Sequence, residues 1–176
     1  MGRVSESLVE QCTECPVWIV GGAVESKKVL VCLDSSDNAL RAVDHAGFML
    51  SGTDCHITIF HTMRHLTRYV PIEVLEDASD IQRLYKEKAG KRVAPYMEKA
   101  REMLFEAGLT EEQVTTRVVD GSRSPADDIL KEARSKGYGT IVLGRRGLSG
   151  LKAFVVGCVT RKILHHSAGL SIWIVQ

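Results

Sequence analysis

The sequence has no hydrophobic run that approaches the roughly 20 residues needed to cross a bilayer. Its first residues, MGRVSESLVEQC, lack the basic start and apolar centre of a signal peptide. It also has no excess of charge, since 23 Lys and Arg stand against 22 Asp and Glu for a formal net charge of +1. A balanced charge gives no electrostatic reason to bind nucleic acid. These absences predict a cytoplasmic protein with neither a membrane nor a nucleic-acid partner.

The cysteines follow no regular spacing. The five residues are Cys12, Cys15, Cys32, Cys55 and Cys158. An odd number, in a chain of 176 residues that can fold without covalent links, predicts free thiols. The close pair Cys12 and Cys15 leaves open a redox pair or half of a metal site. However, this pair follows a helical pattern instead of opening a helix, and a zinc site would need a second pair.

The two ends of the chain repeat each other. Residues 2–20, GRVSESLVEQCTECPVWIV, align without a gap on residues 157–175, GCVTRKILHHSAGLSIWIV. We therefore predict that residues 1–22 are the last helix and strand of a preceding repeat plus the start of a linker, followed by a domain over residues 27–176. An accidental similarity between two helix–strand pairs is the alternative.

Strand and helix patterns alternate along the second of these segments. Apolar, β-branched runs predict strands at 28–34, 56–63, 113–121, 139–144 and 170–175. Amphipathic patterns with caps predict helices at 38–50, 81–107 and 124–137, and another that starts at 158. The expected fold is α/β, a doubly wound five-stranded parallel sheet with helices on both faces, Rossmann-like with strand order 3-2-1-4-5, and an extra N-terminal helix and strand. Residues 63–80 fit either a lid or a mobile loop.

Ligands of such sheets bind beyond the carboxyl ends of the strands, which here carry Asp34, Thr62 and Gly144. Gly147 and Gly157 follow Gly144 before the last helix begins. Glycines permit positive φ and close approach of the main chain to a ligand, and a helix start offers free N–H groups to an anion. The spacing matches neither a Walker A loop nor G-x-G-x-x-G. A phosphate cradle and a purely structural turn both remain open on spacing alone.

The run VLGRRGLSGLKAFVVGCVTRKILHHS, together with VLVCLDSSD, closely resembles the universal stress protein family, whose ATP-binding members carry G-x2-G-x9-G-S/T here. The resemblance covers residues 28–176. It implies binding of ATP or another adenine nucleotide, with or without Mg2+. The binding residues it implies are Cys32, Asp34, Thr62, Leu143, Gly144, Arg146, Gly147, Gly157, Cys158 and Val159.

The chain departs from that motif at Cys158, where nucleotide binders have Ser or Thr. A thiol is a weaker hydrogen-bond donor than a hydroxyl. Backbone N–H groups, with Arg145 or Arg146, are expected to hold the phosphates instead. Asp34 has a second interpretation as a helix cap. His61 and His65 have a metal-like spacing, but one lies in a strand and the other in a loop, so no metal site is expected.

The function expected from this resemblance is a stress-response regulatory module that binds ATP, with slow hydrolysis at most, and not a dedicated enzyme. The alternative is an assembly module of the same fold without nucleotide. Family members pair their last strand across a two-fold axis, which implies a homodimer or pseudo-dimer through that strand. Residues 16–20 are expected to pair with residues 171–175 in the same chain or to exchange between chains. Adenylyl transfer is a weaker third possibility, for which no acceptor site is evident.

Overall fold

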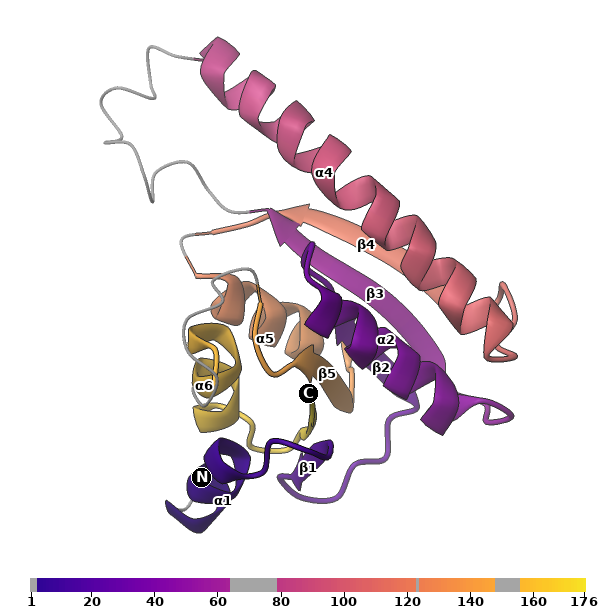
Figure 1. Ribbon diagram of the computed structural model, residues 1–176, viewed down its shortest axis with the longest axis vertical. Helices are drawn as coiled ribbons and strands as arrows, with labels where there is room; N and C mark the ends of the chain where they lie inside the picture. The colour runs from indigo at the N-terminus through magenta and orange to yellow at the C-terminus, as the bar shows by residue number, and fades with distance from the viewer. Residues whose placement is uncertain (1–2, 64–78, 123, 148–155) are drawn as a thin grey trace.

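The computed structural model describes residues 3–63, 79–122, 124–147 and 156–176. They form one twisted sheet with helices on both faces (Figure 1). The strands are β1 (Val17–Val20), β2 (Lys28–Cys32), β3 (His56–Met63), β4 (Val114–Asp120), β5 (Thr140–Gly144) and β6 (Ser171–Val175). The helices are α1 (Arg3–Gln11), α2 (Asp37–Leu50), α4 (Ser79–Glu106), α5 (Pro125–Lys136) and α6 (Cys158–His165).

The sheet has the order β1-β6-β5-β2-β3-β4, in which β2 to β6 are parallel. This confirms the predicted order 3-2-1-4-5 for the five parallel strands. The sheet has six strands instead of five because β1 joins it as an antiparallel neighbour of β6. The N-terminal helix and strand therefore extend the sheet of the same chain, which is the first of the two arrangements predicted for residues 16–20.

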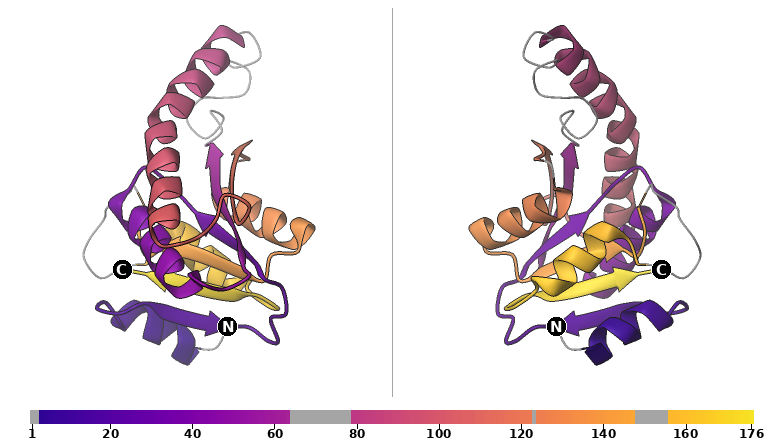
Figure 2. Two further views of the ribbon diagram at one scale, coloured as in Figure 1. Left: turned by 90° about the vertical axis from the view of Figure 1, so that its right-hand side faces the viewer. Right: turned by 90° about the vertical axis from the view of Figure 1, so that its left-hand side faces the viewer.

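Alternate residues of the strands face two separate cores. In β2, Val29 and Val31 belong to the core that includes side chains of α2 and α4, whereas Leu30 belongs to the core that includes side chains of α5 and α6. This period of two is what extended strands impose. Figure 2 shows α1 and β1 at the edge of the sheet next to β6. Val9 of α1 is buried in the second core. Within the described ranges, no helix combines the length and the apolar character that a membrane-crossing segment requires.

Two of the helices begin and end at sequence signals. Ser124 is the N-cap of α5, accepting a hydrogen bond from the Asp127 N–H, and Pro125 occupies the first helical position. Gly137 ends α5 at φ 71°, in the left-handed region that favours glycine. At α2 the N-cap is Ser36, whose hydroxyl accepts from the Ala39 N–H. Asp34 is therefore not the helix cap.

The pairing of β1 with β6 is symmetric about one residue pair. Trp18 lies opposite Trp173, which is its equivalent in the sequence repeat, and the flanking pairs Val17–Ile174 and Ile19–Ile172 are related by the same exchange. The two indoles stack with centroids 4.0 Å apart and planes 2° from parallel. A self-complementary register of this kind is the mark of a two-fold axis, here between two unequal pieces of one chain.

The tryptophan stack is closed on one side by α2. The indole N–H of Trp18 donates to Nε2 of His45 over 3.2 Å. Burial lowers the pKa of His45, despite the opposing charge of Asp44, which favours the neutral imidazole that can accept this hydrogen bond.

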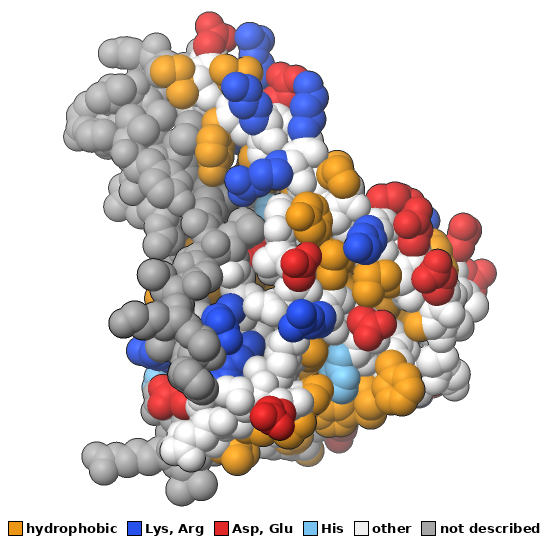
Figure 3. Space-filling view, viewed as in Figure 1, with side chains coloured by type: hydrophobic (Ala, Val, Ile, Leu, Met, Phe, Trp, Pro, Cys, Tyr) orange, Lys and Arg blue, Asp and Glu red, His pale blue; other side chains and the backbone are white. Residues whose placement is uncertain are grey.

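Large hydrophobic side chains are exposed next to this contact. Phe48 of α2 is 78% exposed, and Met49, Trp18 and Val20 are exposed as well. Figure 3 shows hydrophobic side chains gathered on the lower part of this face. Apolar surface that clusters in this way commonly marks a contact with another domain or protein.

Candidate functional site

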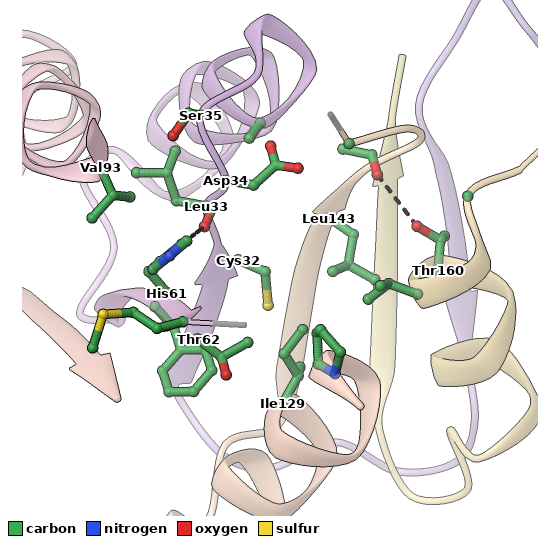
Figure 4. Close-up of a pocket in the computed structure, with 18 of the residues that line it drawn as sticks. Cys32, Leu33, Asp34, Ser35, His61, Thr62, Val93, Ile129, Leu143 and Thr160 are labelled. Carbon is green, nitrogen blue, oxygen red and sulfur yellow. Dashed lines mark hydrogen bonds between the residues drawn. The ribbon is translucent and has the colours of Figure 1, made fainter. Parts of the chain in front are cut away.

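A cavity of about 290 Å3 lies at the carboxyl ends of β2, β3 and β5. The helix α2, which joins β2 to β3, and the helix α5, which joins β4 to β5, lie on opposite faces of the sheet. The cavity therefore sits beside β2, where the strand order reverses. The residues predicted from the sequence all line it, from β2, β3, β5 and the start of α6 (Figure 4): Cys32, Asp34, Thr62, Leu143, Gly144, Arg146, Gly147, Gly157, Cys158 and Val159. The structure thus brings the ten predicted residues into one site.

Asp34 and Gly147 lie against each other across the cavity. A Cβ atom built on Gly147 would be 2.2 Å from Oδ2 of Asp34, so a larger residue there would displace the Asp34 carboxylate. The other carboxylate oxygen accepts a hydrogen bond from the Ser36 hydroxyl. In Figure 4 the Asp34 carboxylate points toward the β5 side of the cavity. Its position is therefore fixed from both sides.

Gly144 is required by packing. A Cβ atom there would lie 2.8 Å from the carbonyl carbon and oxygen of Asn38 in the first turn of α2. Gly144, Gly147 and Gly157 are not among the glycines with positive φ. Of the two reasons considered for glycine, positive φ therefore does not apply here, and close approach applies to Gly144 and Gly147.

Replacing Gly144 by alanine is expected to lower the free energy of unfolding by about 1–3 kcal/mol, because the main chain of α2 must move to admit the methyl group. Gly157→Ala is the matched control, since its nearest contact would be the Arg145 carbonyl oxygen at 3.4 Å. Urea denaturation of both variants measures the difference. Equal urea midpoints for the two variants would show that α2 moves to admit the methyl group without loss of stability.

The start of α6 forms another wall. Its N-cap is Gly157, which offers no side-chain acceptor to the first N–H groups of the helix. The Gly157 N–H donates to the Arg145 carbonyl over 3.1 Å, which ties the helix start to the end of β5. Cys158, the first helical residue, is exposed at the cavity. A helix start with N–H groups left without side-chain acceptors favours an anion.

The two adjacent arginines after β5 point to different places. Arg146 lines the cavity, as does Arg92 of α4, so two guanidinium groups border it. Arg145 is only 1% exposed, and its guanidinium donates to the carbonyls of Glu10 and Cys12 at the end of α1. The expectation that Arg145 holds phosphates is therefore wrong. Its role is to fasten the N-terminal helix to the domain.

The side of the cavity nearest β3 is held by hydrogen bonds. The Thr62 hydroxyl donates to Asp128 of α5 over 2.9 Å, and the Ser122 N–H donates to the same carboxylate oxygen. The Nδ1–H of His61 donates to the Leu33 carbonyl over 2.8 Å. Thr62 can therefore offer a ligand its oxygen as an acceptor, while its proton is directed to Asp128.

The floor of the cavity is apolar. Phe60 and Leu143 are buried there, and Ile129 of α5 adjoins them. Burial, with a smaller contribution from the charge of Asp34, raises the pKa of Cys32, which keeps it a neutral thiol. An apolar floor below a polar rim is the usual build of a small-molecule site.

No cluster of three or more metal-binding side chains occurs in the part of the chain that the structure describes. His61 is within it and is engaged with Leu33. His65, whose spacing from His61 was considered for a metal and set aside, lies outside the described residues, as do residues 64–78 of the segment for which a lid was considered.

A comparison with protein families identifies the chain. The model of the universal stress protein family matches residues 25–175. The chain belongs to this family. Universal stress protein YxiE of Bacillus subtilis (strain 168) is 32% identical over 145 residues, which cover 77% of this chain and 90% of YxiE.

Solved structures of universal stress proteins share the fold. One, a complex with cAMP, has a TM-score of 0.58 at 23% identity and covers 85% of this chain and 95% of its own. Another, from Archaeoglobus fulgidus in complex with dAMP, has a TM-score of 0.55 at 15% identity and covers 88% of this chain and 100% of its own.

This universal stress protein has site residues that its sequence did not reveal. The N-terminal half of α4 extends past the ends of β3 and β4 (Figure 1) and lines the cavity with Tyr85, Ala89, Arg92 and Val93. The helix itself was predicted, but its periodicity reports only the face buried on the sheet. Asp128, which holds Thr62, is likewise one of several acidic residues in α5 and has no distinguishing pattern.

Proposed function

We propose that the cavity binds ATP or another adenine nucleotide and that the protein is a regulatory module of the stress response, with slow ATP hydrolysis at most. One observation carries the proposal: the carboxylate of Asp34, the close-packed Gly147 and the uncapped start of α6 line a single cavity. The complexes of relatives with cAMP and dAMP support an adenine nucleotide as the ligand.

Each part of the nucleotide has a matching wall. The phosphates would lie at the start of α6, where backbone N–H groups and the guanidinium of Arg146 donate to anionic oxygens. Asp34 would accept hydrogen bonds from the ribose hydroxyls. The base would lie over the apolar floor next to Cys32 and Leu143. The Cys158 thiol adds little donor strength, so the backbone would bear most of the phosphate contact.

Magnesium would enter with the nucleotide. Asp34 is the one carboxylate among the described residues that line the cavity. A hard cation held by few protein oxygens takes most of its ligands from phosphates and water. We therefore propose Mg2+ as a companion of ATP and not as a separately bound ion.

A thermal titration tests this function. With ATP and Mg2+ at about 100 times the dissociation constant, the free energy of unfolding rises by about 2.7 kcal/mol, or roughly 5–10 °C in the melting midpoint for a chain of this size. Gly147→Val is expected to abolish the shift, because its side chain takes the space next to Asp34. Cys158→Ser, which restores the hydroxyl of the family motif, is expected to tighten binding.

Pyrophosphate with Mg2+ serves as the control ligand, since it offers the phosphates without base or ribose. A rise in the melting midpoint with ATP but not with pyrophosphate supports a site that binds base and ribose as well as phosphates. If neither the native protein nor Cys158→Ser responds to ATP, the glycines serve only as a structural turn and nucleotide binding is overturned.

We also propose an assembly role as a second candidate function. The register of β1 on β6 is symmetric about Trp18 and Trp173, which supports residues 1–22 as the last helix and strand of a preceding repeat. A complete preceding domain would continue the sheet from β1 and would approach the exposed Phe48 and Met49 of α2. This pseudo-dimer is compatible with nucleotide binding, because the cavity opens at the strand ends and not at the β1 edge.

A further inference from the structure

The turn between α1 and β1 brings two sulfur atoms together. Cys12 follows α1, with its N–H donating to the Leu8 carbonyl over 2.9 Å, and the chain then bends back through Cys15 into β1. The Sγ atoms of Cys12 and Cys15 are 3.0 Å apart. They need to approach by only about 1 Å to reach the length of a disulfide bond.

This turn is held by groups from the opposite end of the chain. The carbonyl of Cys12 accepts hydrogen bonds from the buried Arg145 guanidinium and from the amide of Gln176, the latter over 2.8 Å. The same Gln176 amide lies 3.2 Å from the Cys15 carbonyl and donates to it. Because these contacts fix the main chain on both sides of the turn, the two sulfurs are kept facing each other.

The two thiols differ in acidity. A hydrogen bond from the Cys15 thiol lowers the pKa of Cys12, and the charge of Arg145 acts in the same direction. The pKa of Cys15 is raised, mainly by its interaction with Cys12, with the charge of Glu14 adding to the effect. Cys12 is therefore the thiol that ionises first, and the thiolate is the form that attacks a disulfide.

We propose that Cys12 and Cys15 form a reversible disulfide by exchange with small-molecule disulfides such as oxidised glutathione. The Cys12 thiolate attacks one glutathione sulfur, a Cys12–glutathione bond forms, and one glutathione thiolate leaves. Cys15 then loses its proton and attacks the Cys12 sulfur, which releases the second glutathione. Two protein thiols are oxidised and one glutathione disulfide is reduced to two thiols.

The position of the pair favours the oxidised form. It lies after the last turn of α1, where the negative end of the helix dipole opposes the stabilisation of the Cys12 thiolate by Cys15 and Arg145. Strongly oxidising pairs have a stabilised reduced form, so this pair is expected to hold its disulfide well and not to pass it on. It is thus a site of reversible modification on the N-terminal segment, and not an oxidoreductase centre.

Mass spectrometry tests the proposal directly. The full chain is equilibrated in mixtures of reduced and oxidised glutathione, alkylated and digested with trypsin. Cleavage after Arg3 and Lys27 releases Cys12 and Cys15 on one peptide that contains none of the other cysteines. Excess oxidised glutathione is expected to give this peptide unalkylated, two hydrogens lighter and without glutathione. Excess reduced glutathione is expected to return both alkylation sites.

Single variants identify the order of attack. Cys15→Ser is expected to stop at the mixed disulfide and accumulate one glutathione on Cys12, whereas Cys12→Ser is expected to react at least tenfold more slowly at neutral pH. Two alkylated thiols in the native peptide under excess oxidised glutathione would overturn the proposal. A stable mixed disulfide on the native chain, or a disulfide between two chains, would overturn it equally.

Discussion

Arg145→Met is expected to lower the free energy of unfolding by about 3 kcal/mol and the melting midpoint by roughly 6–12 °C. The methionine would keep most of the buried volume but would leave the carbonyls of Glu10 and Cys12 without their guanidinium donor. A hydrogen bond from a charged donor contributes about 1.5–3 kcal/mol, and the substitution removes two such bonds, both partly buried. Differential scanning calorimetry at neutral pH measures the change.

The neighbouring residue provides a matched control. Arg146→Met makes the same chemical change at a residue of the cavity wall, so it is expected to weaken ATP binding. The melting midpoint of the ligand-free variant is expected to stay within about 2 °C of the native value. Arg145→Lys tests the geometry, since an ammonium has the charge but not the planar fork that reaches two carbonyls. If Arg145→Met had the same melting midpoint as the native protein, the Arg145 side chain would not be what holds α1 on the domain.

Deleting residues 1–22 is expected to turn the protein into a dimer at micromolar concentration. Removal of β1 exposes the edge of β6, whose five residues are buried in the intact chain. An open apolar edge pairs with another strand. The register about Trp173 allows a second β6 to take the place of β1 around the same axis. Light scattering after size exclusion should give twice the mass of one truncated chain.

A peptide of residues 1–22 supplied in trans controls for this effect. It is expected to return the truncated chain to the mass of one domain plus one peptide, and to raise its melting midpoint by restoring the burial of Val9 and Val17. A truncated chain with unchanged mass and unchanged midpoint would show that β1 does not protect the edge.

Most of the fold follows from local sequence patterns. The buried parallel strands are recognisable in the sequence as short apolar runs. Ser124, Pro125 and Gly137 mark both ends of α5 at the predicted positions. The repeat with Trp18 and Trp173 also pointed to the sixth strand. Ten residues expected from the family resemblance line one cavity, because in a parallel sheet the carboxyl ends of neighbouring strands meet at one edge.

The sequence could not show in which direction individual side chains point. Arg145 and Arg146 are identical and adjacent, yet one is buried against α1 and the other lines the cavity. The Arg145 N–H donates to the Val175 carbonyl over 2.6 Å, so the strand-like path continues past β5 and successive side chains diverge. The contribution of α4 to the cavity also depends on where a long helix crosses the sheet, which only tertiary packing decides.

Because β1 is part of the same chain, the fraction of molecules in which the edge of β6 is covered does not depend on protein concentration. Two separate chains that pair through β6 part when their concentration falls below the dissociation constant. Here the covering strand is joined to the domain by the seven residues 21–27 between β1 and β2. A short tether of this kind holds its ends at an effective concentration in the millimolar range. The edge of β6 is therefore covered to the same extent whether the cell makes few copies of the protein or many.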